Sequence, residues 1–468
     1  MPGDSRVLAL SALGPQLMSN VLLISYLFPP AAGVGSPRAL NFARYLPQHG
    51  CRVIVLTTRF ATTAYNDLNL LQSIPLETAV YRAFNPEIPY RFRDRVWKRV
   101  ALARHIPQPG GGAPAAPPGS RWARPLKELA RLAIQRVACP DAQVGWAHFA
   151  TRAAIRIVEN HGIEAVLLNT PPYSSMRIAV SLKQRYPHLK LIADIRDDWV
   201  GYYLPYFDSA ATEEKRGLAE RLEAQLIRSS DYVSAVTPAQ MRQIRDRYSD
   251  QPAEKFFCTP NGYDPQAFRE FRSRPHGQER LIVTYFGSVY GNSVYSPKQY
   301  LDAVDALNGV RIESRFIGRV AAEAAAFFSG RRGSVRQLGF MPQAEGLRYL
   351  EETDLLLLIA SDRTTHAGKL FDYLATGKPI LALSPPDGEI ARVLRETRTG
   401  QCVDPGDRGA IQRALVDAYQ RLRSGTLYNE PDWNAIEAYA WPNLVASLAR
   451  RTGIATAVEC ASMISSRG

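Results

Sequence analysis

The sequence lacks the patterns that several classes of protein require. Its five cysteines are scattered among 468 residues without any CxxC spacing, so neither a disulfide framework nor a zinc site is predicted. No apolar run approaches the ~20 residues that span a bilayer. The weak apolar stretch before Gly14 and Pro15 does not read as a signal peptide. We therefore expect a protein of the reducing cytoplasm.

The chain has fewer acidic residues than basic ones. The chain has 57 Lys and Arg residues against 44 Asp and Glu residues, a formal net charge of +13. Such a balance suits anionic partners, whether a nucleotide-sugar, nucleic acid or an acidic membrane surface. The positive charge is dispersed and accompanies no recognised nucleic-acid-binding module, which argues against nucleic acid as the partner.

Short apolar runs alternate with helical segments in two successive sets. The first set begins with a strand at 20–25, a helix at 39–49 and a strand at 52–56, and the second begins with a strand at 281–285. This alternation predicts parallel sheets, and thus an α/β protein with two doubly wound, Rossmann-like domains. We predict a disordered extension at 1–18, an N-terminal domain at 19–265, a C-terminal domain at 266–430, a helix at 431–452 and a flexible tail at 453–468.

A basic insertion interrupts the first domain at about 90–136. Two segments, about 91–106 and 121–137, can each form a helix with Arg and Lys on one side and apolar residues on the other. Such helices either lie on an anionic membrane surface or pack as ordinary solvated helices on a domain. The first interpretation predicts a peripheral position on the inner face of the cell membrane, and both stay open.

A Gly-rich loop follows the first predicted strand. Gly33 and Gly35 lie where this strand passes to a helix, and Arg38 at the helix start either meets a phosphate or simply faces solvent. Glycine allows close backbone approach, and a helix N-terminus favours an anion. The third glycine of a dinucleotide fingerprint is missing, so a tight turn is the alternative.

A second loop of the first domain, DIRDDW, concentrates acidic residues after a predicted strand at 191–193. Asp194 or Asp197 is a candidate to orient an acceptor hydroxyl, with Arg196 holding one of the acids. The alternative is a structural salt-bridge network.

Strand ends of the second domain carry candidate phosphate contacts. Gly287 and Ser288 end one strand and allow the backbone to approach a phosphate. Lys298 lies a short loop later, and Arg319 closes the next strand. Basic side chains at these positions are predicted partners of a pyrophosphate.

The segment 366–384, HAGKLFDYLATGKPILALS, is the most informative part of the chain. Lys369 and Asp372 share one face at the start of a predicted helix, because they are three residues apart. Free N–H groups at a helix start and a nearby cation suit phosphates, and a carboxylate suits ribose hydroxyls. An ordinary amphipathic helix with a surface ion pair is the alternative.

Five segments in order resemble the GT-B glycosyltransferases of the large retaining family 4, in particular its bacterial polysaccharide-assembly subgroup: SYLFPPAAGVGSPRALNFARYL, DIRDDW, PNGYD, YFGSVYG and HAGKLFDYLATGKPILAL. The resemblance runs from about 20 to 450, with the basic insertion matched least. It implies two facing Rossmann-like domains with a cleft between them and a nucleotide-diphosphate sugar held mainly by the C-terminal one. It also implies a helix that crosses back at about 433–448, and a diphosphate that Gly33 and Gly35 face.

The resemblance also implies roles for single residues. Asp372 stands where the family has a Glu that binds the ribose hydroxyls, and Lys369 lies on the same nucleotide-binding element. Thr364 stands where many members have an earlier Glu that contacts the donor sugar or its phosphate side. His366, two residues on, is the candidate to contact the sugar instead, although a lone His is more often structural. No metal ion and no cofactor is implied.

The sequence thus predicts a glycosyltransferase that moves a sugar from a nucleotide-diphosphate donor to a saccharide or lipid-linked acceptor, with retention. Its predicted catalytic candidates are Asp194, Asp197 and His366. Two alternatives stay open: a nucleotide-sugar epimerase of the same fold, and a non-catalytic protein that binds an anionic ligand or a membrane surface.

Overall fold

The computed structural model describes residues 19–33, 35–59, 66–87, 140–208, 211–274, 277, 279–289, 291, 296–331, 333–360, 362–428 and 430–454. The predicted extension at 1–18, the basic insertion with its two helices, and all but the first two residues of the predicted tail lie outside the described residues. The chain divides into two compact units. Unit 1 comprises Met1–Ala235, Ile244–Phe257 and Leu448–Gly468, and unit 2 comprises Val236–Gln243 and Cys258–Ser447.

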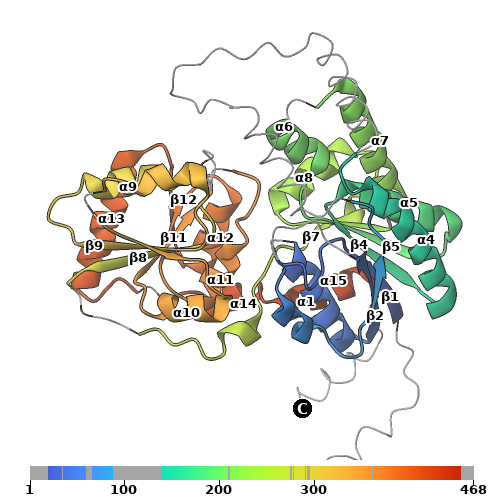
Figure 1. Ribbon diagram of the computed structural model, residues 1–468, viewed down its shortest axis with the longest axis horizontal. Coiled ribbons are helices and arrows are strands. Elements are labelled where there is room, and N and C mark those ends of the chain that lie inside the picture. The colour runs from blue at the N-terminus through green and yellow to red at the C-terminus, as the bar shows by residue number, and fades with distance from the viewer. Residues whose placement is uncertain are drawn as a thin grey trace, which may run out of the picture. The chain divides into compact units, whose positions relative to one another are not determined.

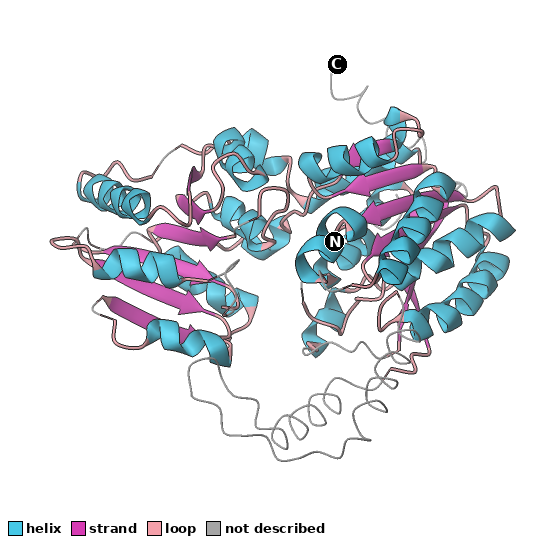
Figure 2. Ribbon diagram, turned by 90° about the horizontal axis from the view of Figure 1, so that it is seen from above, coloured by secondary structure: helices cyan, strands magenta, loops and turns pink. Residues whose placement is uncertain are grey.

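Unit 1 is built on a seven-stranded sheet in the order β3-β2-β1-β4-β5-β6-β7, in which β1 to β6 pair in parallel. The chain turns back at β1, as in doubly wound folds. Helices cover both faces of this sheet (Figure 2). The strands are β1 (Ser19–Ile24), β2 (Cys51–Thr58), β3 (Ala79–Ala83), β4 (Ala165–Thr170), β5 (Lys190–Ile195), β6 (Tyr232–Ala235) and β7 (Phe256–Cys258).

The helices of unit 1 follow the strands in the alternating pattern that the sequence predicted (Figure 1). They are α1 (Ser36–Tyr45), α4 (Val144–His161), α5 (Met176–Arg185), α6 (Leu204–Phe207), α7 (Glu213–Ser229) and the second half of α8 (Pro238–Arg247). Because helices cover both faces, the central strands are buried: β4 has no exposed residue, whereas the edge strand β3 exposes Tyr81 and Arg82.

Unit 2 has a six-stranded, all-parallel sheet in the order β10-β9-β8-β11-β12-β13, which turns back at β8. Its strands are β8 (Leu281–Phe286), β9 (Ile312–Ile317), β10 (Ser334–Gly339), β11 (Leu355–Ile359), β12 (Ile380–Leu383) and β13 (Gly400–Val403). Its helices are α9 (Lys298–Asp305), α10 (Gln343–Glu351), α11 (Lys369–Thr376), α12 (Glu389–Thr397), α13 (Arg408–Arg423) and α14 (Trp433–Glu437).

Alternate residues of the β11 strand serve two separate cores of unit 2. Leu355 and Leu357 face one core, together with side chains of α9 and α13. Leu356 and Leu358 face the other, together with side chains of α10, α11 and α12. Successive strand residues point to opposite faces, so a continuous apolar run fills both. The predicted fold class, two Rossmann-like domains of the α/β type, is thereby confirmed.

Two helices stand where one was predicted at 431–452. α14 ends at Glu437, and α15 (Trp441–Thr452) begins four residues later. The intervening backbone pairs with Tyr263, whose N–H donates to the carbonyl of Tyr439 and whose carbonyl accepts from Trp441. These bonds replace helical ones at this point. Within the part of the chain that the structure describes, no helix has the length and apolar character needed to cross a membrane.

Candidate functional site

Helix α11 carries Lys369 and Asp372 in unit 2, after β11 and before β12. Its apolar residues pack into the core, where Leu370 and Phe371 are fully buried. Lys369 and Asp372 lie on the other side of the helix, away from the core, and both stay partly accessible. The amphipathic pattern therefore places the two candidate binding residues on one side of the helix, as predicted.

Tyr373 fixes α11 against two strands, at the end of β8 and the middle of β11. Its buried hydroxyl accepts a hydrogen bond from the N–H of Phe286 at 2.8 Å and donates one to the carbonyl of Leu357 at 3.2 Å. Sequence reasoning did not single out this residue. The available signal was a tyrosine within a buried apolar stripe, because a buried hydroxyl needs partners.

The ammonium group of Lys369 lies against the backbone at Gly287. A Cβ atom at Gly287 would come within 2.7 Å of Lys369 Nζ, and φ at this glycine is +154°, so no other residue fits without strain. The same ammonium lies 3.6 Å from the centroid of the Tyr285 ring. The Tyr285 hydroxyl donates to the carbonyl of Ser288 at 3.0 Å. The structure thus brings together three predicted residues: Lys369, Gly287 and Ser288.

Lys369 and Asp372 do not form the surface ion pair that was the alternative interpretation. No hydrogen bond or ion pair joins either side chain to another described residue. Burial lowers the pKa of Lys369 to about 7. Burial, and secondarily the charge of Asp264, raises the pKa of Asp372 to about 7. A partly buried acid and base without protein partners are typical of a site that binds a charged ligand.

The remaining two basic candidates of unit 2 have other contacts. Lys298 forms an ion pair with Asp302, one turn further along α9. The Arg319 guanidinium lies 4.8 Å from the centroid of the exposed Phe340 ring. Its backbone carbonyl accepts from the N–H of Val289, next to Ser288. Their predicted contacts with a pyrophosphate stay predictions.

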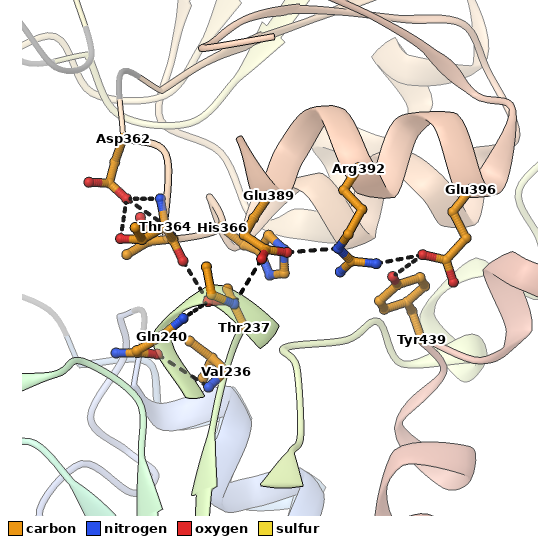
Figure 3. A network of polar contacts seen from close by, with 12 residues as sticks. Val236, Thr237, Gln240, Asp362, Thr364, His366, Glu389, Arg392, Glu396 and Tyr439 are labelled. Atoms are coloured by element: carbon orange, nitrogen blue, oxygen red, sulfur yellow. Dashed lines mark hydrogen bonds and ion pairs between the residues drawn. The ribbon is translucent and has the colours of Figure 1, made fainter. Parts of the chain in front are cut away.

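His366 is enclosed in a network of polar contacts in unit 2 (Figure 3). Its side chain has no exposed surface, and neither ring nitrogen has a hydrogen-bond partner in the described part of the chain. Its Nε2 atom lies 4.0 Å from the carboxylate of Glu389, and its ring meets Phe371 edge-on. Burial, with the charge of Arg392, lowers the pKa of His366 to about 3, so the imidazole is neutral.

Asp362 shapes the segment that leads to His366. One oxygen of its carboxylate accepts from the N–H and the hydroxyl of Thr364, at 2.7 and 2.9 Å, and from the N–H of Thr365 at 2.7 Å. Thr364, predicted to stand where many members of the resembling family have a Glu, therefore serves the fold of this segment. Sequence reasoning missed Asp362, although an Asp two residues before a Thr is a common turn signal.

In unit 1, Arg38 and Asp194 form a two-pronged ion pair with one another. Arg38 Nε and Nη2 donate to the two carboxylate oxygens of Asp194 at 2.7 and 2.6 Å, and Asn169 donates to the same carboxylate at 2.7 Å. The side chains of Arg38 and Asp194 are at most 1% exposed. This geometry matches the salt-bridge alternative for Asp194. The Arg38 guanidinium, a candidate to meet a phosphate, binds Asp194 instead.

Two predicted residues of unit 1, Gly35 and Asp197, meet at Arg196. A Cβ atom at Gly35 would collide with the Arg196 guanidinium, which in turn donates to Asp197 at 3.0 and 3.1 Å. The Asp197 side chain is 34% exposed, so its carboxylate remains accessible. Gly33, two residues before Gly35, has a positive φ of 131°. Of the two predicted acids in this loop, Asp197 is the one that a ligand can reach.

The third acid of DIRDDW is buried in a cluster that sequence reasoning did not assign. Asp198 accepts from Arg247 at 2.7 and 2.8 Å, and Glu223 accepts from the hydroxyl of Tyr248 at 3.1 Å. Burial, reinforced by Asp198, raises the pKa of Glu223. Asp198 and Glu223 are fully buried and both have hydrogen-bond partners within this cluster, which indicates a structural role.

The comparisons with known proteins agree with this architecture. Residues 35–262 match the family model described as a glycosyl transferase 4-like domain. No curated protein matches the chain significantly. Similar solved structures include sucrose-phosphate synthase from Thermosynechococcus elongatus (13% identity, TM-score 0.58, covering 92% of this chain and 98% of that one). The lipopolysaccharide outer core galactosyltransferase WaaB is similar as well (13%, 0.58, 92% and 99%).

A third similar structure is HepE from Anabaena, determined in complex with UDP-glucose (12% identity, TM-score 0.56, covering 92% of this chain and 98% of that one). At these identities the likeness concerns the fold, which is the two-domain, Rossmann-like GT-B fold. The two parallel sheets, each covered by helices, are the elements that match it.

Proposed function

We propose that this chain, a GT-B glycosyltransferase with a glycosyl transferase 4-like domain at residues 35–262, moves a sugar from a nucleotide-diphosphate donor to a saccharide or lipid-linked acceptor, with retention. The reaction belongs to glycan assembly on the inner face of the cell membrane. The net charge of +13 and the basic insertion at about 90–136 support that place, since both suit an anionic surface.

One observation supports the donor site above all. Lys369 and Asp372 stand one helical turn apart, both partly accessible, and neither has a charged partner among the described residues. The ammonium group of Lys369 beside the backbone of Gly287 suits a diphosphate, and the Asp372 carboxylate suits two vicinal ribose hydroxyls. As the glycosidic bond breaks, charge grows on the leaving diphosphate, and a fixed cation stabilises it.

The acceptor end of the proposal rests on Asp197. Its carboxylate is held by Arg196 yet remains one-third exposed, so it can accept a hydrogen bond from an acceptor hydroxyl. The neutral imidazole of His366 is the candidate to hydrogen-bond the donor sugar. Neither role requires a metal ion, and no cofactor is part of the proposal.

A thermal-shift panel tests the proposed function. UDP, GDP, ADP and CDP are each added at millimolar concentration to the full chain. A nucleoside diphosphate present at 100 times its Kd stabilises the native state by about 2.7 kcal/mol. We expect one of them to raise Tm by several degrees and the corresponding nucleoside to raise it less, because the nucleoside lacks the diphosphate. A panel in which no nucleoside diphosphate shifts Tm would refute the donor site.

Asp372→Asn should weaken nucleotide binding at least tenfold while stabilising the empty protein at pH 8. The folded protein holds the Asp372 proton up to about pH 7, whereas the unfolded chain releases it near the ordinary value of 3.8. The stabilising contribution of this carboxyl is therefore complete below about pH 4 and is lost as the pH rises through 7. Asparagine avoids that loss, worth roughly 1–2 kcal/mol after allowance for partial exposure.

Denaturation curves at pH 4 and pH 8 check this prediction, together with calorimetric titration of the nucleoside diphosphate. The Tm values of the variant and the wild type should coincide at pH 4 and diverge at pH 8. Asp417→Asn, on the exposed side of α13, is the matched control and should change neither quantity. Unchanged nucleotide affinity in Asp372→Asn would move the ribose contact to another residue.

A further inference from the structure

We propose that Thr237 and Glu389 are positioning residues that hold the segment 362–368, here called the donor loop, so that His366 meets the sugar of the donor. The inference rests on the proposed function and adds two residues to it. The donor loop follows β11 and leads directly into α11. Thr237 and Glu389 come from two other segments of unit 2, the start of α8 and the start of α12.

The order of the binding residues along α11 gives the donor a direction. If Asp372 binds the ribose and Lys369 the diphosphate, the molecule runs toward the N-terminus of the helix, over about 4.5 Å of helix axis. The sugar comes after the diphosphate. It therefore lies beside the residues that precede Lys369, which are those of the donor loop. UDP alone, which ends at the diphosphate, does not reach them.

The donor loop is held from outside at two backbone carbonyls. The Thr237 hydroxyl donates to the carbonyl of Thr364 at 2.5 Å (Figure 3). The N–H of Glu389 donates to the carbonyl of Arg363 at 3.0 Å. A Cβ atom at Gly388 would come within 3.2 Å of the Arg363 backbone, so α12 begins in close contact with the loop. These contacts fix the path of the chain two to three residues before His366.

The hydroxyl group of Thr237 makes two hydrogen bonds. It donates to the donor loop, and it accepts from the N–H of Gln240 at 3.0 Å, which caps the first turn of α8. The side chain is fully buried, so water cannot replace either bond. A serine can make both hydrogen bonds, whereas a valine of nearly the same shape can make neither. This position therefore offers a clean pair of substitutions.

The carboxylate of Glu389 connects the start of α8 to the imidazole. One oxygen accepts from the N–H of Ala239 at 2.9 Å, and the other accepts from Arg392 at 2.8 Å (Figure 3). The second oxygen lies 4.0 Å from His366 Nε2, about 1 Å beyond hydrogen-bond distance. Glu389 is itself only 4% exposed, so its position depends on these partners.

His366 has unsatisfied hydrogen-bonding groups that a ligand could satisfy. Its imidazole is fully buried, and both nitrogens lack hydrogen bonds to described residues, which is costly for a polar ring. After a small movement, the carboxylate of Glu389 can accept a hydrogen bond from Nε2–H, which leaves Nδ1 free of hydrogen and able to accept one from a sugar hydroxyl. The contacts of Thr237 and Glu389 then fix the position of the imidazole ring relative to the bound sugar.

The experiment compares binding of a nucleoside diphosphate with binding of its sugar conjugate. The probes are UDP with UDP-glucose, GDP with GDP-mannose, and ADP with ADP-glucose, and the pair with the largest wild-type thermal shift is titrated by calorimetry. In Thr237→Val we expect affinity for the nucleoside diphosphate to stay within twofold of wild type, and affinity for the conjugate to fall at least tenfold. Thr237→Ser should restore it.

Glu389→Gln gives a second, independent measurement, because it keeps the size of the side chain and removes its charge. We expect the same selective loss of affinity for the conjugate, with the nucleoside diphosphate unaffected. Glu396→Gln is the matched control. Glu396 lies on the same helix and also binds Arg392, but makes no contact with the donor loop. Its affinities for both ligands should equal those of the wild type.

Equal losses for both ligands in Thr237→Val, no loss for either, or failure of Thr237→Ser to restore binding would each overturn the positioning role. If the Thr237→Val protein does not fold, Glu389→Gln provides the test. Unaltered affinity of Glu389→Gln for the conjugate would overturn the positioning role as well. Wild-type protein that binds no nucleoside diphosphate refutes the proposed function, and this inference with it. The two failures are thereby distinguishable.

Discussion

Replacing Lys369 by methionine is expected to slow sugar transfer by about 100- to 1,000-fold, the usual cost of removing a group that stabilises charge in a transition state. The ammonium group of this residue lies 3.6 Å from the Tyr285 ring centroid and against the backbone of Gly287, with no acidic partner among the described residues. The proposed partner of this ammonium group is the diphosphate of the donor. Methionine keeps the length and apolar contacts of the side chain and removes its charge.

The same substitution should stabilise the empty protein at pH 7. The pKa of Lys369 is lowered from 10.5 to about 7 in the folded state. The unfolded chain therefore holds a proton that the folded chain loses between these values, and stability falls as the pH drops from above 10 toward 7. Methionine has no proton to lose. A higher Tm together with slower transfer is the expected combination for a binding residue.

Initial rates of transfer and denaturation curves measure the two effects. Lys215→Met is the matched control, since Lys215 pairs with Asp208 on the surface of unit 1 and should leave both rate and donor affinity unchanged. Lys369→Arg keeps the charge but is bulkier, so partial activity is expected. Transfer by Lys369→Met at more than one third of the wild-type rate would show that this ammonium does not stabilise the leaving diphosphate.

Asp194→Asn should destabilise the protein by about 3–5 kcal/mol, the cost of breaking a buried ion pair by removing one charge. Asp194 has no exposed surface and takes both prongs of Arg38, together with a hydrogen bond from Asn169. Asparagine has nearly the same shape but supplies no negative charge to the guanidinium. Arg38 is itself 1% exposed, so water does not take the place of the lost charge.

The double variant Arg38→Met with Asp194→Leu separates pairing from catalysis. Replacing a whole buried ion pair by apolar residues is often close to neutral, so it should recover most of the lost stability. Denaturation in urea measures both variants. If Asp194 only supports the fold, Asp194→Asn turns over substrate within a few-fold of wild type at a temperature where it is folded. A loss above 100-fold in folded protein would instead support the predicted catalytic role.

Much of the fold could be predicted from local pattern. The apolar runs at 355–359 and 380–383 coincide with β11 and β12, because strands buried on both faces read as continuous apolar segments. The helix predicted at 431–452 was wrong as a single helix. It is interrupted where residues 439–441 pair with Tyr263, a partner more than 170 positions away, and helical periodicity carries no sign of it.

The residue types of the candidate site could be predicted from the sequence, but the contacts of their side chains could not. The three-residue spacing of Lys369 and Asp372 predicted a shared helix face, and both stay accessible there. The same spacing fitted an ion pair equally well, and only the folded structure shows that none forms between them. Tyr373, Asp362 and Glu389 drew no attention in the sequence, because a tyrosine or an acid near a helix start has many ordinary explanations.

By itself, the sequence determined the α/β class, the alternation of strands and helices in two successive sets, and the segment in which a cation and an acid share a helix face. These properties follow from periodicity and turn chemistry over a few residues. The tertiary structure alone decided the partners. Arg38 meets Asp194 across 156 positions, Thr237 meets Thr364 across 127, and Ala239 meets Glu389 across 150. Such pairings depend on how distant segments pack, and packing decides whether an acid is a buried support or a group that a ligand can reach.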